Sequence, residues 1–250
     1  LDLTNGLLTC LDGNYQAEDG TDCRNYGGVE GLPEARRLFA ACLGVQPEEI
    51  MINGNSSLAL MHDLIARAML FGVDDQARPW SEKPIKFLCP CPGYDRHFAL
   101  CEYFKIEMIP ITMNQDGPAM EQVEALVAND ESIKGIWCVP MYSNPTGITF
   151  SDQVVTRLAS MKTKATDFRI FWDNAYALHH LTEHPDHLQD ILQTCKDVNN
   201  PDRVYMFSST SKISYAGAGL AMVASSANNI RRLAKQMSFQ EFVYRRCKFV

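Results

Sequence analysis

The chain has 250 residues, 46% of them hydrophobic and 21% charged, which is ordinary for a globular protein and fits one large α/β domain or two smaller ones. The formal net charge of −7 argues against nucleic acid or an anionic membrane surface as the main partner, but it is compatible with a local basic pocket for a phosphate. No apolar run of about 18 residues occurs, so we expect no membrane-spanning helix.

Short apolar runs alternate with longer amphipathic ones from about residue 33 to 235. The first helix is expected to begin at Pro33, a residue favoured at the first helical position, and to end at Gly44. A strand follows at 50–53, and then a helical run with apolar residues at Leu58, Met61, Ile65 and Met69.

The same alternation continues along the chain. Further strands are predicted at 85–89, 107–111, 133–139, 168–172, 203–207 and 220–224, and further helices at 94–104, 119–129, 151–162 and 187–198. Several strands lack period-two alternation, as expected for strands covered on both faces. We therefore predict an α/β fold with a mainly parallel sheet and helices on both sides. The connection 72–84, which contains Trp80, is expected to be exposed.

The cysteines and the start of the chain indicate a cytoplasmic protein. The nine cysteines are an odd number without a disulfide framework, and Cys89 and Cys91 lack the usual zinc spacing. We expect them to be buried and reduced. The first residues, Leu-Asp-Leu-Thr-Asn, lack the features of a signal peptide. They also lack an initiator Met, so we expect the natural start to lie upstream.

Four histidines lie close together at positions 179, 180, 184 and 187. A metal site would need further ligands at suitable spacing, but Pro185 interrupts the run and no second cluster completes a site. We predict no metal.

Polar residues follow the strands at the places where ligands bind in parallel sheets, beyond the carboxyl ends. Asn55, Ser56 and Ser57 lie between a strand and a helix start, where backbone N–H groups and hydroxyls can bind a phosphate. A simple serine helix cap is the alternative there. Tyr94 follows the second strand and can lie flat on a cofactor ring, or it can be a core or turn tyrosine.

Two further features follow later strands. Asn144 precedes Pro145, which favours an extended backbone, so its amide can face a ring oxygen; a plain Asn-Pro turn is the alternative. Asp173 ends an apolar strand, where a buried charge requires a cationic partner such as a pyridinium nitrogen. Tyr176 could donate to the phenolic oxygen of the same ring. The alternative for Asp173 is a helix cap.

Lys212 completes the set. It lies just beyond an apolar strand in the run Ser-Ser-Thr-Ser-Lys, with Ser209 and Ser211 beside it. Its amine could form a Schiff base while the hydroxyls hold a phosphate. A surface lysine is the ordinary reading, but the Asp, the Asn and the phosphate loop on sister strands favour pyridoxal phosphate as a covalent cofactor.

These residues in this order resemble the fold-type I pyridoxal-phosphate enzymes of the aspartate aminotransferase superfamily. The runs Ser-Asn-Pro-Thr-Gly, Asp-x-x-Tyr and Ser-x-Ser-Lys carry the likeness, and Pro-Gly-Tyr-Asp-Arg-His-Phe resembles the MocR-like class I subgroup. The resemblance implies a three-layer α/β/α large domain with about seven strands. It implies an N-terminal arm at 1–32, the large domain at 33–240 and an atypical tail at 241–250, without the C-terminal small domain.

The resemblance also implies roles for these residues. Lys212 would carry the internal aldimine and shuttle the proton, Asp173 would pair with the ring nitrogen, and Tyr176 would complete the catalytic set. The cofactor would further contact Asn55, Ser56, Ser57, Tyr94, Asn144, Ser209 and Ser211. Tyr26 would reach the phosphate of a neighbouring subunit, which implies a homodimer.

The chain departs from the family pattern in two ways. The arginine usual eight residues past the lysine is missing from Ala-Gly-Ala-Gly-Leu at 216–220, so the phosphate would depend on hydroxyls, backbone and helix dipole, or on another cation. The chain is also shorter than family members, so we expect a fragment. The expected activity is transamination of aspartate with 2-oxoglutarate. A β-lyase or decarboxylase on the same core, or a cofactor-binding fragment without enzymatic role, stays open.

Overall fold

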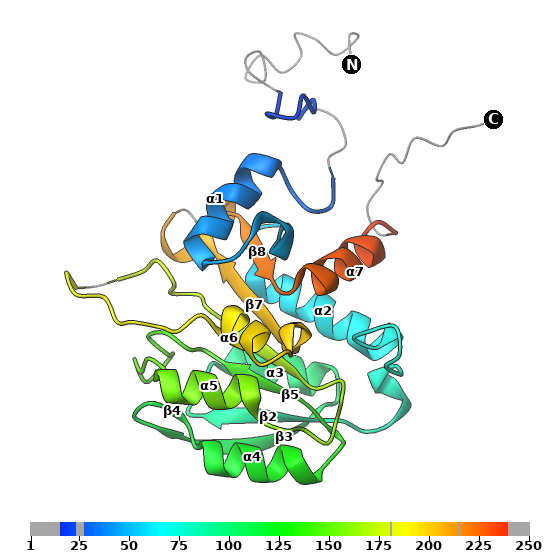
Figure 1. Ribbon diagram of the computed structural model, residues 1–250, viewed down its shortest axis with the longest axis vertical. Helices are drawn as coiled ribbons and strands as arrows, with labels where there is room; N and C mark the ends of the chain where they lie inside the picture. The colour runs from blue at the N-terminus through cyan, green and yellow to red at the C-terminus, as the bar shows by residue number, and fades with distance from the viewer. Residues whose placement is uncertain (1–15, 24–27, 181, 215, 240–250) are drawn as a thin grey trace.

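The fold is built around one twisted, eight-stranded sheet (Figure 1). The structure, a computed structural model, describes residues 16–23, 28–180, 182–214 and 216–239. The strand order across the sheet is β1-β8-β7-β6-β5-β2-β3-β4. The strands are β1 Ile50–Ile52, β2 Lys86–Cys91, β3 Glu107–Asn114, β4 Gly117–Pro118, β5 Ile133–Cys138, β6 Arg169–Asp173, β7 Val204–Ser209 and β8 Ala221–Ala224.

Five neighbouring strands, β3, β2, β5, β6 and β7, run parallel to one another, while β8 pairs antiparallel with both β7 and β1. This confirms the predicted α/β fold with a mainly parallel sheet. The seven predicted strands are all present. The eighth, β4, has two residues that pair antiparallel with the end of β3, too short a segment to produce a pattern in the sequence.

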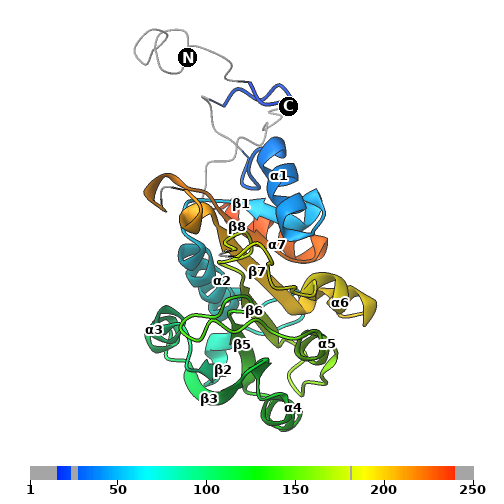
Figure 2. The same cartoon turned by 90° about the vertical axis from the view of Figure 1, so that its left-hand side faces the viewer.

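Helices cover both faces of the sheet. The longer helices are α1 Pro33–Leu43, α2 Ser57–Phe71, α3 Asp95–Tyr103, α4 Met120–Asn129, α5 Asp152–Ser160, α6 Ile191–Asp197 and α7 Ala227–Met237. Figure 2 shows α2 and α3 on one side of the sheet and α4, α5 and α6 on the other. Two apolar cores result, one on each face of the sheet. Buried side chains of α7 belong to the core with α2 and α3, and those of α1 belong to the core with α4, α5 and α6.

The local signals at the helix ends behave as expected. Pro33 occupies the first position of α1, and Gly44 ends it in the left-handed conformation, with φ of 71°. Ser56 and Ser151 cap α2 and α5, each accepting a hydrogen bond from the backbone N–H three residues on. Helix α6 begins at Ile191, four residues later than predicted, because Asp190 provides the cap.

The connection 72–84 is exposed over much of its length, as expected, but Trp80 within it is not. Trp80 begins a short 3₁₀ turn, and its side chain is buried in the core between the sheet and α2. The indole Nε1 donates a hydrogen bond to Asp167 Oδ2 over 2.9 Å, and its ring meets Phe87 edge-on. This buried tryptophan therefore anchors the loop to the core.

The predicted division of the chain into an arm, a large domain and a tail stays a prediction. Residues 33–239, apart from the two positions left undescribed, pack around the single sheet. The predicted tail at 241–250 lies outside the described residues, as does most of the predicted arm.

An ion pair at the amino ends of the strands gives a test of the fold's electrostatics. Hydrogen bonds from Ser132 and Lys86 lower the pKa of Asp130 from 3.8 to about 2. Because the folded pKa is depressed, the stabilisation is present above the ordinary pKa and is lost as pH falls through the folded one. We expect Asp130→Asn to lower the free energy of unfolding at neutral pH by about 1 kcal/mol, the shift being discounted for solvent screening.

Urea denaturation between neutral pH and about pH 2 checks this expectation. The difference between wild type and Asp130→Asn should shrink across the window from 3.8 to about 2. Glu131→Gln, an exposed neighbour, is the control for loss of one negative charge. A difference that stays constant with pH would contradict the assigned ion pair.

Candidate active site

The predicted site residues meet in one cavity at the carboxyl ends of the parallel strands. The cavity has a volume of about 260 Å³. Ten of the eleven predicted cofactor contacts line it, namely Asn55, Ser56, Ser57, Tyr94, Asn144, Asp173, Tyr176, Ser209, Ser211 and Lys212. The eleventh, Tyr26, lies outside the described residues. Residues up to 157 positions apart in the sequence are thus brought together because parallel strands end at a common edge.

One wall of the cavity is the beginning of α2. Ser56 caps this helix, with its Oγ accepting from Ala59 N over 3.3 Å, and Ser57 is its first residue. Asn55 Nδ2 donates to the carbonyl of Gly217 over 3.2 Å, which ties this loop to the segment after Lys212. The N-terminus of a helix of 15 residues points its free N–H groups into a cavity lined with hydroxyls. The helix cap and the phosphate-binding interpretation are therefore compatible.

The opposite wall is the turn that follows β7. Ser209 ends this strand, and its Oγ accepts from the backbone N–H of Ser211 over 3.4 Å. The resulting 3₁₀ turn, Thr210–Lys212, places Lys212 Nζ 5.8 Å from the ring centroid of Tyr176. An ammonium at this distance from an aromatic face is attracted by the ring. Of the described residues that line the cavity, Lys212 alone carries a full positive charge.

Asp173 lies at the floor of the cavity, as the last residue of the fully buried strand β6. Its side chain is almost completely removed from solvent. Oδ2 is 3.0 Å from Nε2 of His97, whereas Oδ1 is buried without a hydrogen-bond partner within the described residues. An unsatisfied buried carboxylate oxygen is costly. This cavity-lining carboxylate is therefore anchored through one oxygen, while its other oxygen lacks a donor in the described part of the chain.

His97 is not among the residues predicted for the site. Its imidazole is buried, contacts Asp173 and meets the ring of Tyr94 edge-on at 5.1 Å between centroids. A signal was available: His97 lies three residues after Tyr94, so on a helix both side chains project to the same face. Since a carboxylate only accepts hydrogen bonds, Nε2 of a neutral His97 carries the proton and donates it.

Tyr94 lies at the start of α3, on the cavity wall above Asp173. Burial raises the pKa of its hydroxyl, and the negative charge of Asp173 raises it further. The phenol therefore stays protonated in the neutral range. Its aromatic face, half removed from solvent, is available to a flat group in the cavity.

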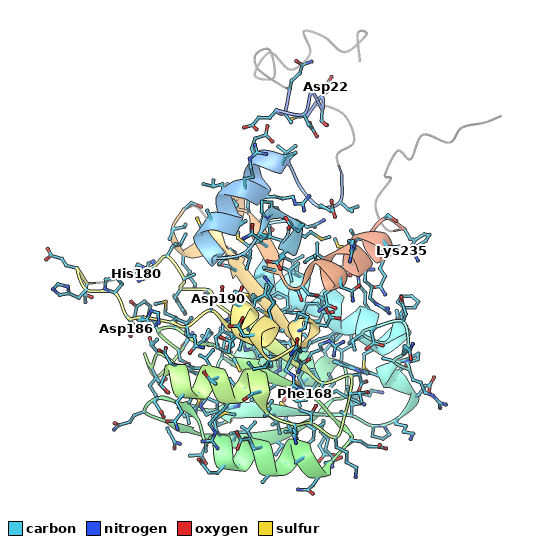
Figure 3. The ribbon with its side chains drawn as sticks, viewed as in Figure 1. Asp22, Phe168, His180, Asp186, Asp190 and Lys235 are labelled. Atoms are coloured by element: carbon cyan, nitrogen blue, oxygen red, sulfur yellow. The ribbon has the colours of Figure 1, made fainter. Side chains whose placement is uncertain are left out.

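The turn that carries Asn144 is a tight one. Ser143 N donates to the Ile148 carbonyl over 2.8 Å, and the peptide bond between Asn144 and Pro145 is cis. The Tyr142 hydroxyl, just before this turn, contacts His180 Nδ1 at 3.1 Å and accepts from Asp186 N over 3.1 Å. The histidine-bearing loop, which projects from the body with His180 and Asp186 labelled in Figure 3, is thus fastened to the Asn144 turn.

The histidine-rich loop does not assemble a metal site within the described part of the chain, where no group of three or more His, Cys, Asp or Glu side chains could hold an ion. None of the helices there is long and apolar enough to cross a membrane.

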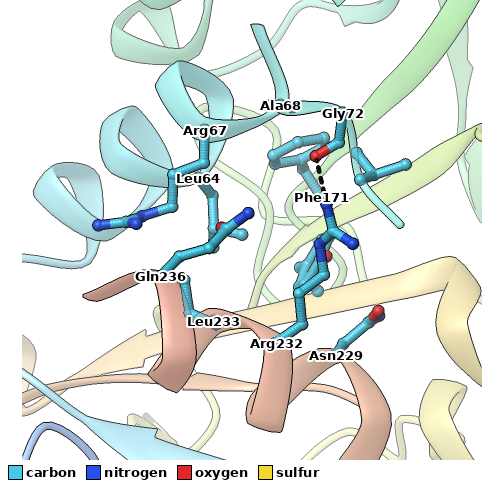
Figure 4. A pocket seen from close by; sticks show the side chains of 11 residues that line it. Leu64, Arg67, Ala68, Gly72, Phe171, Asn229, Arg232, Leu233 and Gln236 are labelled. Carbon is cyan, nitrogen blue, oxygen red and sulfur yellow. Dashed lines mark hydrogen bonds between the residues drawn. The ribbon is translucent and has the colours of Figure 1, made fainter. Parts of the chain in front are cut away.

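Two other hollows differ from this site. The one in Figure 4, between α2 and α7, has a volume of about 20 Å³, room for a single water, and Arg232 Nη2 closes it by donating to the Gly72 carbonyl. A wider hollow of about 760 Å³ lies under the loop 74–85. There Asp167 is already satisfied by Trp80 and by Lys134 at 2.6 Å.

Known proteins resemble this chain over nearly its whole length. Residues 1–245 match the family of aspartate amino-transferases. A protein of Mycolicibacterium smegmatis, named as a presumed aminotransferase, is 52% identical over 235 residues, which are 92% of this chain and 55% of that protein. An aspartate aminotransferase of Corynebacterium glutamicum is 48% identical over 231 residues, covering 92% of this chain and 53% of that protein.

A solved structure extends the comparison to the fold. An aspartate transaminase from Corynebacterium glutamicum matches with a TM-score of 0.89 and 44% identity, over 96% of this chain and 57% of that one. The chain spans about half the length of the curated relatives it matches. Since the family match runs over nearly all 250 residues, the chain belongs to the family of aspartate amino-transferases.

Proposed function

We propose that this chain forms the cofactor-binding part of a pyridoxal-phosphate-dependent aminotransferase that acts on aspartate and 2-oxoglutarate. The observation that carries the proposal is the open Oδ1 of buried Asp173 in the same cavity as Lys212. A carboxylate oxygen that is buried and unpaired needs a positively charged donor. A protonated pyridine nitrogen is such a donor, and Lys212 supplies the amine for covalent attachment.

The residues present fit this cofactor. Asp173 Oδ1 would accept from the ring nitrogen while His97 holds Oδ2. Tyr94 would lie against the ring, and Asn144 and Tyr176 would bind its phenolic oxygen. A cavity of about 260 Å³, lined by Asp173 and Lys212, accommodates one such ring with its phosphate.

The phosphate would lie at the start of α2. Ser56, Ser57, Ser209 and Ser211 offer hydroxyls around one end of the cavity, and the α2 N-terminus offers free N–H groups. Asn55 closes the ring of polar groups by its bond to Gly217. This arrangement uses dipoles and hydroxyls in place of the arginine that the segment 216–220 lacks.

Bound pyridoxal phosphate supplies an electron sink for the substrate Cα. The task of Asp173 is to keep the ring nitrogen protonated, because its buried negative charge favours a positive neighbour. Lys212 Nζ would be the base that accepts the proton from the substrate Cα and would donate it back to the substrate–cofactor adduct. Tyr176 lies beside Nζ and restricts where the amine can reach.

The substrate assignment follows the relative named aspartate aminotransferase, which is 48% identical to this chain. The proposal includes a cytoplasmic location and a homodimer in which Tyr26 of each subunit reaches the phosphate of the other. The net charge of −7 and the absence of membrane-spanning helices from the described residues support small-molecule substrates over nucleic acid or membrane partners.

The covalent role of Lys212 can be tested directly. Wild-type protein incubated with pyridoxal phosphate and then reduced with borohydride should carry a phosphopyridoxyl group on Lys212, located by peptide mass spectrometry. Lys212→Ala should carry no stoichiometric phosphopyridoxyl group on any lysine, while Lys235→Ala, a change at an exposed position, should behave as wild type. Stoichiometric labelling of Lys212→Ala at another lysine would contradict the assignment.

Two matched variants separate the proposed phosphate contact of Ser56 from its role as the cap of α2. Ser56 and Ser151 each cap a helix with an Oγ that accepts over 3.3 Å. Ser56→Ala and Ser151→Ala should therefore each lower stability by about 1 kcal/mol. Only Ser56→Ala should weaken binding of pyridoxal phosphate, by roughly fivefold, without weakening binding of pyridoxal, which lacks the phosphate. Equal effects of both variants on the cofactor would exclude a phosphate contact at Ser56.

The reaction class can be tested with an acceptor assay. The cofactor-loaded chain given aspartate should form oxaloacetate in an amount that depends on added 2-oxoglutarate, with glutamate as the second product. Lys212→Ala should form neither. Release of ammonia or CO₂ without an acceptor would instead indicate a lyase or decarboxylase.

A further inference from the structure

Trp137 lies next to the candidate site but does not line the main cavity. It belongs to β5 and pairs in register with Phe171 of β6, and only 2% of its surface is exposed. Its indole lies parallel to the imidazole of His97, with 4.3 Å between ring centroids and 8° between planes. This is a face-to-face contact between a core tryptophan and the residue that holds Asp173.

The indole is itself held in place by α3. Its Nε1 donates to the Sγ of Cys101 over 3.2 Å, and both groups are buried. Cys101 is four residues after His97, so the two side chains lie one turn apart on the same face of α3. Trp137 therefore spans two successive turns of α3, contacting His97 with its face and Cys101 with its edge.

These contacts determine the orientation of the imidazole. The terminal torsion of a histidine is broad and does not by itself select one ring plane. Here Tyr94 meets the ring edge-on, at an interplanar angle of 88°, and Trp137 covers a face. Rotation of the ring would require displacement of one of them. In the ring plane that these contacts allow, His97 Nε2 lies 3.0 Å from Asp173 Oδ2, and Asp173 Oδ1 has no donor among the described residues.

We propose that Trp137 is a positioning residue for the ring-nitrogen site: it holds His97 in the plane that donates to Asp173 Oδ2, so that Oδ1 alone is presented to the cofactor. This inference rests on the proposed function, because it assigns Oδ1 to a pyridine nitrogen. It goes beyond that function by extending the site to a tryptophan that contacts neither substrate nor cofactor.

Loss of the indole has a defined chemical consequence. With His97 free to rotate, Asp173 loses the donor on Oδ2, and its carboxylate is no longer held in one orientation. The ring nitrogen of the cofactor is then held less firmly. We expect roughly tenfold weaker binding of pyridoxal phosphate, on the order of 1.4 kcal/mol.

The variants Trp137→Leu and Trp137→Phe separate the two contacts of the indole. Leucine removes both the flat ring and the N–H, whereas phenylalanine keeps a ring that can stack on His97. Cofactor affinity, measured by absorbance titration, should fall about tenfold in the leucine variant and stay within about threefold of wild type in the phenylalanine variant. If Trp137→Leu does not fold, Trp137→Met fills more of the volume without offering a ring and takes its place.

Trp80→Phe is the matched control. Trp80 is equally buried in the same core, also contacts Phe87, and also donates its indole N–H to a side chain. Trp80 lies near the amino ends of the strands, whereas the candidate site lies at their carboxyl ends. Its variant should lose stability without a change in cofactor affinity, which separates general loosening of the core from an effect on the site.

Two further readouts report on His97 itself. Nitrogen NMR of the cofactor-free protein should show the proton of His97 on Nε2 in wild type and Trp137→Phe, and a mixture of tautomers in Trp137→Leu. In a His97→Leu background, Trp137→Leu should weaken cofactor binding no further, since residues that act through one another are not additive.

The outcomes separate the inference from the proposed function. If Trp137→Leu leaves both the cofactor affinity and the His97 tautomer as in Trp80→Phe, or if its effect is fully retained without His97, the positioning role is wrong. If wild type fails to bind pyridoxal phosphate more tightly than Asp173→Ala does, the proposed function is wrong. In that case the NMR measurement still decides whether Trp137 orients His97.

Discussion

The buried carboxylate of Asp173 is the constraint on which the rest of the candidate site depends. It ends a strand whose residues are all removed from solvent, so water does not compensate its charge. One oxygen is satisfied by His97 and the other is not. A protein that keeps a half-satisfied carboxylate in its core forgoes stability there, and this is understandable where a ligand supplies the missing donor.

Both cores of the molecule contribute to holding this group. On one face of the sheet, α3 brings His97 and Tyr94 over the end of β6, and Trp137 fills the space between helix and sheet. On the other face, Trp172, which precedes Asp173, packs edge-on against Phe150. Because residues adjacent along a strand point to opposite faces, β6 is held from both sides immediately before its polar end. The charged group is thus placed by rigid elements rather than by a loop.

The cavity above Asp173 has an uneven distribution of charge. The end that we propose for the phosphate is made of hydroxyls, an amide and a helix N-terminus. The one full positive charge among the described lining residues, Lys212, lies toward Tyr176. Dipoles and hydroxyls can hold an anion, but each contact is weaker than a bidentate arginine. The loops around this end are accordingly tied to one another, as in the bond from Asn55 to Gly217.

Much of this molecule could be predicted from its sequence, and the reason is local. The alternation of apolar runs and amphipathic stretches predicted the seven main strands and the helices α1 to α6, but not α7. The strand ends marked by Asn55, Asn144, Asp173 and Lys212 located the site, because parallel strands place such ends at one edge. Only the tertiary structure decided how Asp173 is held. Its partner His97 comes from a helix 76 positions away, and Trp137 from a different strand. The burial of Trp80 and the two-residue strand β4 likewise depend on neighbours distant in the chain. Periodicity records which face of an element is buried, whereas the identity of the contacting residue depends on the packing of separate elements, which no local pattern contains.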